Sequence, residues 1–257
     1  MSKFTFVKIS KNKKIRYLFN NSSGDIYLVF LHGFKSDLEG DKPKTLYKFC
    51  KKNKIGFLAL EYSGHGKSYG KFEDGTITSW TKDAQKVIRK KILKKKYILV
   101  GSSMGGWIGL NLFNSFGKKI LAFVGIAPAP EFLDRLMWNK FTSKVKKQLI
   151  KEKFYNFNHG GFEYNISYNL IKDGKKNKIF NKIFTNKIYL TIIHGKKDEV
   201  VPISISKQIM KIFKNAEKKL IIIRNGDHSL SKKNNLKRLT NEIKLIYNKL
   251  RPSRIVG

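Results

Sequence analysis

The sequence has one cysteine, few acidic residues and no long apolar run. Because Cys50 is the single cysteine among 257 residues, neither an intrachain disulfide nor a cysteine-based metal site can form. No apolar stretch reaches the roughly 18 residues that a membrane-spanning helix needs. The N-terminus alternates apolar and polar residues as a strand does and lacks the apolar segment of a secretory signal, with a basic transit peptide as the alternative. We expect a cytoplasmic protein with Cys50 buried on a helix.

The scarcity of acidic residues gives the chain an extreme charge. Asp and Glu number 18 against 54 basic residues, so the formal net charge is +36. Such a charge can indicate binding to nucleic acid or to an anionic membrane surface. Only seven of the basic residues are Arg, which is favoured for phosphate recognition, and the lysines are spread along the whole chain. We interpret the charge as compositional, and expect no specific nucleic-acid partner and only nonspecific binding to anionic surfaces.

Continuous apolar segments alternate with segments of helical spacing. The expected strands are 26–33, 55–62, 96–101, 120–128, 187–195 and 218–225, and the expected helices are 44–53, 78–93, 104–116, 204–213 and 233–250. This alternation is typical of an α/β fold, with a mostly parallel central sheet flanked by helices on both faces. Two N-terminal strands, at about 4–9 and 14–19, should form an antiparallel edge.

Residues 131–186 interrupt this alternation. The stretch mixes aromatic residues with Lys, Asn and Gly between two strands that a short crossover could connect. We predict a small cap of helices and loops here, inserted into a core formed by residues 1–130 and 187–257. A structural elaboration without a role in the site is the alternative.

The segment "ILVGSSMGGW" predicts a nucleophile. Gly101, Ser103 and Gly105 fit the pattern G-x-S-x-G between an expected strand and an expected helix, where a sharp turn exposes a serine. The glycines two residues to either side leave room for the turn. This register selects Ser103 over Ser102.

A serine nucleophile needs a base and an acid that orients the base. His228 in "NGDHSL" follows the last expected strand, and Asp198 in "HGKKDEVVP" follows the strand before it. Both therefore lie at strand C-termini, where open α/β sheets place their sites. We predict Asp198 as the acid, with Glu199 and Asp227 as the competing residues.

Two backbone N–H groups should stabilise a developing oxyanion. We assign one to Met104, at the N-terminus of the helix that follows Ser103, and the other to Phe34 in "LHGFKSD". His32 and His194 are expected to be structural. His159 in the cap is expected to face solvent.

Three further residues are predicted to line the substrate pocket: Trp107, His65 and Trp138. Trp107 and Trp138 would supply apolar surface, and His65 in "SGHGKS" would lie at the rim. No grouping of His, Asp or Glu has the spacing of metal ligands, so we predict neither a metal nor a cofactor.

Taken together, "FLHGF", "YSGHGKSYG", "ILVGSSMGGW", "HGKKDEVVP" and "GDH" resemble the motifs of the α/β-hydrolase superfamily. The order Ser103, Asp198, His228 is that of its triads. "FVGIAPAP" adds a similarity to mitochondrial palmitoyl-protein thioesterases that act as acyl-glucuronide esterases, and to their bacterial relatives. The first loop departs from a Pro-Gly-Tyr type of turn, because it reads His32-Gly33-Phe34.

The resemblance implies a serine hydrolase with a small cap that acts on small-molecule carboxylic esters or thioesters. A palmitoyl-protein thioesterase is the narrower alternative, and a peptidase or a carbon–carbon bond hydrolase is another. The alternative from a different class is a basic pseudoenzyme that binds a ligand or nucleic acid.

Overall fold

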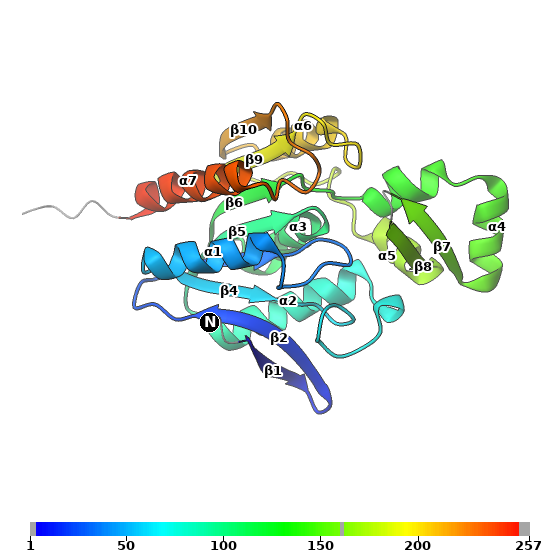
Figure 1. The fold of residues 1–257 in the computed structure, drawn as a ribbon, viewed down its shortest axis with the longest axis horizontal. Helices are drawn as coiled ribbons and strands as arrows, with labels where there is room; N and C mark the ends of the chain where they lie inside the picture. The colour runs from blue at the N-terminus through cyan, green and yellow to red at the C-terminus, as the bar shows by residue number, and fades with distance from the viewer. Residues whose placement is uncertain (1–3, 160–161, 252–257) are drawn as a thin grey trace, which may run out of the picture.

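The computed structural model describes residues 4–159 and 162–251 and shows one large sheet with a separate cap (Figure 1). Eight strands pair in the order β1-β2-β4-β3-β5-β6-β9-β10. Their bounds are β1 (Phe4–Ser10), β2 (Lys13–Asn20), β3 (Ile26–Leu31), β4 (Gly56–Leu60), β5 (Lys96–Ser102), β6 (Ile120–Ile126), β9 (Tyr189–Gly195) and β10 (Glu217–Ile223). From β4 to β10 all pairs are parallel, and β1 and β2 form the predicted antiparallel edge.

The central strands are apolar throughout because both faces of the sheet are covered. On β3, Leu28 and Phe30 belong to one apolar cluster, while Val29 and Leu31 belong to the cluster on the opposite face. The edge strand β10 begins with three exposed charged residues, which discourage pairing with another chain.

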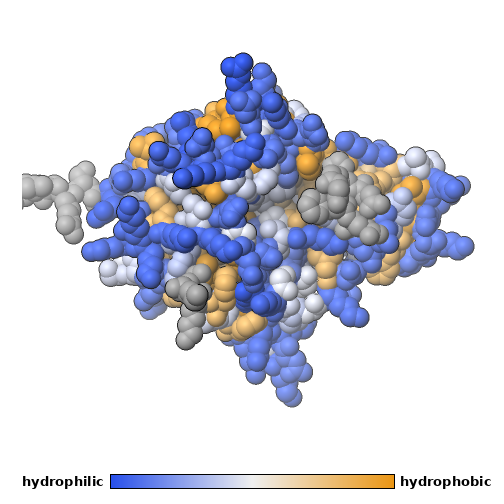
Figure 2. All heavy atoms as spheres, in the orientation of Figure 1, coloured by the Kyte–Doolittle hydropathy of each residue, from blue (hydrophilic) through white to orange (hydrophobic). Residues whose placement is uncertain are grey.

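Helices cover the two faces. On one face lie α1 (Asp41–Lys52), which holds the buried Cys50, and α7 (Lys233–Leu250), which has the predicted bounds. On the other face lie α2 (Ile77–Ile92), α3 (Met104–Phe116) and α6 (Ile203–Ile212). In the described part of the chain, no helix is long and apolar enough to cross a bilayer. Hydrophilic side chains cover most of the face that Figure 2 shows.

The cap differs from the expected set of helices and loops because it contains a hairpin. Its helical elements are η2 (Leu133–Met137), η3 (Trp138–Lys140), α4 (Ser143–Glu152) and α5 (Tyr168–Lys176), and its strands are β7 (Phe154–His159) and β8 (Phe162–Ser167). Residues 154–157 of β7 alternate between exposed and half-buried side chains. The sequence of β8, FEYNIS, alternates apolar and polar residues, and this period of two is the signal that the sequence analysis missed. The side chain of His159 lies outside the described residues. The boundaries 131–186 stay a prediction.

Glu131 joins the beginning of the cap to its end. Its side chain is buried, and one carboxylate oxygen accepts hydrogen bonds from the backbone N–H groups of Ile179 (2.8 Å) and Phe180 (2.9 Å). The other oxygen accepts from Arg135 Nε at 2.9 Å. Burial alone would raise the pKa of Glu131, but these hydrogen bonds outweigh it and lower the pKa. One carboxylate thus holds two segments that are nearly 50 residues apart.

We expect Glu131→Ala to lower the free energy of unfolding by about 3 kcal/mol, because it leaves two N–H groups without their acceptor. Chemical denaturation measures this change. The control is Asp134→Ala, which removes a neighbouring ion pair to Lys178 on a partly exposed surface and should cost about 1 kcal/mol or less. Equal losses in the two variants would contradict the role given to Glu131.

Candidate active site

Ser103 lies at the turn between β5 and α3 in a strained backbone conformation. Its φ is +51° and its ψ is −118°, a region that non-glycine residues rarely adopt. The turn forms because two chain segments approach closely at the flanking glycines. A Cβ at Gly101 would lie 2.6 Å from the carbonyl oxygen of Gly105, and a Cβ at Gly105 would overlap the backbone of Leu31. The small residues of the motif are therefore a steric requirement.

Three side chains from distant segments meet beside this turn. His228 Nε2 lies 3.1 Å from Ser103 Oγ, and His228 Nδ1 lies 2.8 Å from Asp198 Oδ2. Because a carboxylate only accepts, Nδ1 carries the proton and Nε2 presents its lone pair to the serine hydroxyl. The competing acids lie elsewhere: Glu199 is exposed, and Asp227 accepts from the Leu230 N–H.

Asp198 is held as a carboxylate although its side chain is buried. Burial would raise its pKa, but hydrogen bonds from His194 and His228 outweigh that effect and hold the pKa well below the usual range. Its second oxygen accepts from the backbone N–H groups of Val200 (2.9 Å) and Val201 (2.8 Å). The negative charge that faces His228 is therefore fixed in position.

The two backbone groups predicted for the oxyanion hole flank Ser103. Phe34 lines the same cavity as Ser103, and Met104 is the first residue of α3. Neither N–H donates a hydrogen bond to another residue of the part of the chain that the structure describes. At Met104 this is the ordinary state of a helix N-terminus, whose first N–H groups lack partners in the helix. Both groups are therefore available to a ligand oxygen.

Buried histidines support the loop that carries Phe34. His32 Nδ1 donates to the Gly33 carbonyl oxygen (2.8 Å), and His65 Nδ1 donates to that of Ser63 (3.2 Å). Their rings lie 5.0 Å apart, and neither Nε2 has a partner among the described residues. Burial lowers the pKa of His32 to about 4, and burial together with repulsion from His32 lowers that of His65 to about 3. Both imidazoles are neutral at physiological pH.

A cavity of about 350 Å³ opens in front of Ser103 and His228. Its wall combines residues of the core loops with apolar residues of the cap. The lining residues are Gly33, Phe34, Ser36, Lys42, Ser102, Ser103, Ala129, Phe132, Leu136, Met137, Lys140, Phe157, Tyr164, Val200, Val201, His228 and Ser229. Sequence reasoning missed the cap part of this wall, because four of its residues lie at 132–140, where the short helical turns gave no clear periodicity, and two lie on the unrecognised hairpin.

The three residues predicted to line this pocket lie elsewhere, which corrects that prediction. Trp107 is fully buried beneath the cap, where its Nε1 donates to the Asn177 carbonyl oxygen at 2.9 Å. His65 is buried behind the loop that carries Phe34, against Trp80. Trp138 is half-buried within the cap against Tyr168, with Lys175 Nζ 4.4 Å from its ring centroid. Each aromatic ring faces a packing partner instead of the cavity.

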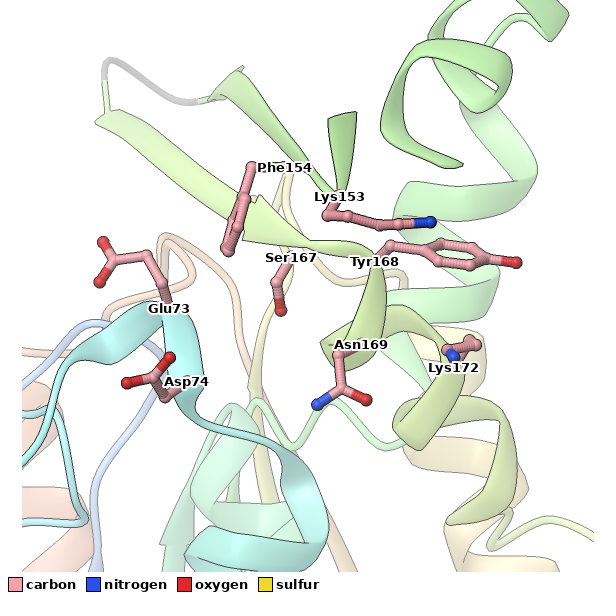
Figure 3. A pocket seen from close by; sticks show the side chains of 8 residues that line it. All are labelled: Glu73, Asp74, Lys153, Phe154, Ser167, Tyr168, Asn169 and Lys172. Atoms are coloured by element: carbon pink, nitrogen blue, oxygen red, sulfur yellow. The ribbon is translucent and has the colours of Figure 1, made fainter. Parts of the chain in front are cut away.

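A second pocket of about 330 Å³ lies between the cap and the 3-10 helix η1 (Phe72–Asp74). Figure 3 shows Glu73 and Asp74 across from Phe154 and Ser167. The Ser167 hydroxyl accepts from the Leu170 N–H, and no histidine is among the described residues that line this pocket. It therefore lacks a nucleophile paired with a base. Across the described residues, no three His, Cys, Asp or Glu side chains gather as metal ligands.

The mostly parallel sheet, the cap and the serine at the β5–α3 turn define an α/β hydrolase. A family model described as Hydrolase_4, serine aminopeptidase S33, matches residues 24–164. The chain belongs to this family.

Individual relatives agree with this assignment. The chain is 28% identical over 227 residues to the bovine (Bos taurus) mitochondrial palmitoyl-protein thioesterase ABHD10, covering 87% of this chain and 73% of that protein. The structure of mouse α/β hydrolase domain-containing protein 10 matches with a TM-score of 0.88 and 25% identity, over 97% of this chain and 100% of that one. A putative hydrolase from Agrobacterium vitis S4 also has a TM-score of 0.88, at 26% identity and with 96% and 98% coverage.

The buried histidines predict a pH dependence of stability. Their folded-state pKa values lie below the unfolded value of about 6.5, so protons bind the unfolded chain more tightly. The contribution of these two histidines to the free energy of unfolding is complete above about pH 6.5. It is lost as the pH falls toward 4 for His32 and toward 3 for His65. Between pH 6 and pH 5, we expect the free energy of unfolding of His65→Phe, measured with urea, to fall by about 1 kcal/mol less than that of the parent. Parallel pH profiles would contradict this account.

Proposed function

We propose that this protein is a serine hydrolase that cleaves carboxylic esters or thioesters through an acyl-enzyme intermediate. The observation that supports it most is the continuous chain of contacts from Ser103 Oγ through His228 to Asp198, with distances of 3.1 and 2.8 Å. Ser103 and His228 line the cavity, and the strained serine lies beside two N–H groups that have no partner among the described residues. Those are the parts that acyl transfer requires.

In the first half of the reaction, Ser103 Oγ attacks the carbonyl carbon while its proton passes to His228 Nε2. The carbonyl oxygen takes up negative charge and accepts hydrogen bonds from the N–H groups of Phe34 and Met104. Asp198 stabilises the imidazolium that forms. When the tetrahedral intermediate collapses, His228 gives its proton to the leaving alkoxide or thiolate.

In the second half, water attacks the acyl group on Ser103. His228 removes a proton from that water, and the same two N–H groups bind the oxyanion. Collapse of this intermediate breaks the ester bond to Ser103 Oγ, which regains its proton from His228. The products are a carboxylic acid and a restored serine.

The cavity favours an apolar acyl group. Phe132, Leu136 and Met137 of the cap face the same space as Ser103, and Phe157 and Tyr164 of the hairpin extend this wall. The mitochondrial relative is named for palmitoyl-protein thioesterase activity, so a long acyl thioester is the narrower form of the proposal. The substrate is a small-molecule acyl ester or thioester, and we propose no metal, cofactor or specific nucleic acid. The cytoplasmic location stays a prediction.

Replacement of Ser103 tests the proposal with an internal control. We expect Ser103→Ala to lower kcat for p-nitrophenyl butyrate by at least about 10⁴-fold, because the nucleophile is lost. The adjacent Ser102→Ala should keep kcat within about ten-fold of the parent, since Ser102 lies outside the contacts to His228. Steady-state kinetics measures both. Turnover by Ser103→Ala at the rate of the parent would contradict the proposal.

The charge on the cavity wall predicts discrimination against cationic substrates. Lys42 and Lys140 line the cavity, and no Asp or Glu belongs to its described lining. Burial lowers the pKa of Lys42, against the opposing effect of Asp227 and Asp41, and its Nζ donates to the Ser231 hydroxyl at 3.0 Å. A positive substrate therefore meets a partly desolvated ammonium on the cavity wall, while Asp227 and Asp41, the carboxylates that act on Lys42, are not among the described lining residues.

We expect butyrylcholine to be hydrolysed with a kcat/KM about ten-fold or more below that of its neutral isostere, 3,3-dimethylbutyl butyrate, because like charges repel in the cavity. Lys42→Met should reduce the difference between the kcat/KM values of the two esters. The control Lys48→Met, on an exposed position of the same helix, should leave it unchanged. Equal kcat/KM values for the two esters in the parent protein would show that the cavity charge has no effect on selection.

A further inference from the structure

His194 is a second histidine in contact with the acid of the candidate triad. It occupies the penultimate position of β9 and is fully buried. Its Nε2 lies 2.9 Å from the Val201 carbonyl oxygen and 3.2 Å from Asp198 Oδ2, and its Nδ1 lies 2.7 Å from Ser206 Oγ on α6. The sequence analysis expected His194 to be structural, and the motif "HGKKD" gave no sign of the contact with Asp198.

These contacts fix which nitrogen of His194 carries the proton. A carbonyl oxygen and a carboxylate both only accept, so the Nε2 that faces them carries the hydrogen. The neutral ring then presents its Nδ1 lone pair to the Ser206 hydroxyl, which donates. Accepting this hydrogen bond draws electron density from the ring and makes the Nε2–H a stronger donor. Ser206 therefore acts on Asp198 through His194.

Asp198 Oδ2 is shared between two imidazoles. The first is His228, at 2.8 Å, and the second is His194, at 3.2 Å. The other oxygen is already held by the N–H groups of Val200 and Val201. A carboxylate with all these donors cannot rotate, and each additional donor reduces the negative charge available to His228.

We propose that His194 is a positioning residue that fixes the Asp198 carboxylate and weakens its attraction for the proton of His228. His228 then releases its extra proton at a lower pH than it would without the His194 contact. It is therefore available as a base over a wider range of pH. This inference rests on the proposed function for its kinetic consequence, while its effect on the titration of His228 is independent of turnover.

Among the described residues, few other charged groups lie near Asp198 and its two histidines. From β9 the titratable group is His194, and from the loop before α7 it is His228. Asp227, next to His228 in sequence, interacts electrostatically with Lys42. On the segment of Asp198 itself, the side chains of Lys197 and Glu199 are exposed. Ser206 contributes a neutral hydroxyl from α6.

Three variants test the proposal through the pH dependence of kcat/KM for p-nitrophenyl butyrate. His194→Phe keeps a ring but removes the donor, and we expect the acidic limb to move up by about one pH unit. His194→Gln keeps a side-chain N–H and should return the limb toward the parent position. Ser206→Ala should give a smaller shift in the same direction, and it decides the question if His194→Phe does not fold.

A merely structural role predicts a different result. Activity would fall equally at every pH, the acidic limb would stay in place, and His194→Gln would not differ from His194→Phe. That outcome overturns the proposal, as does an unshifted limb in a folded Ser206→Ala protein.

A second measurement separates this inference from the proposed function. The imidazole C2 proton of His228 can be titrated by NMR, with its signal assigned by its absence in His228→Gln. A higher titration midpoint in His194→Phe or Ser206→Ala supports the inference even if no ester is hydrolysed. An unchanged midpoint contradicts it, whatever the catalytic activity.

Discussion

The structure depends on the close approach of β5, α3 and the end of β3 at one turn. Because no side chain fits at Gly101 or Gly105, the chain can bend sharply there and hold Ser103 at a positive φ. The same bend begins α3 and leaves the Met104 N–H without a helical partner. A single steric constraint therefore exposes the hydroxyl and provides an N–H group beside it.

The remaining parts of the site follow from the parallel sheet. Parallel strands end at the same edge, so loops that are far apart in sequence reach Ser103 there. Asp198 follows β9 and His228 follows β10, and His228, 125 residues after Ser103 in the sequence, contacts both Asp198 and the serine hydroxyl. In a chain of net charge +36, the Asp198 carboxylate that faces His228 is buried, is held by four donors and is shared by two histidines. We interpret this as a local design that is independent of the overall composition.

The sequence predicted the core better than the cap. Apolar runs and helical spacing located the strands and helices of the sheet layers. The positions of Ser103, Asp198 and His228 relative to those strands selected three side chains that the structure shows in contact. The pocket was not predictable in the same way, because its wall depends on how the cap folds onto the core. Trp107 is one helical turn beyond Ser103, yet its ring packs into the cap base with Asn177. The contact of His194 with Asp198 depends on tertiary packing against α6, which no local pattern records.

The central claim is that Ser103 carries the acyl group during turnover. The direct measurement is mass spectrometry of protein quenched in acid while it hydrolyses p-nitrophenyl butyrate, followed by peptide mapping. The account predicts a butyryl adduct on the peptide that contains Ser103, located at that serine by fragmentation and absent when the ester is exhausted. Turnover with no adduct in a rapid-quench time course, or with the adduct on another residue, would contradict it.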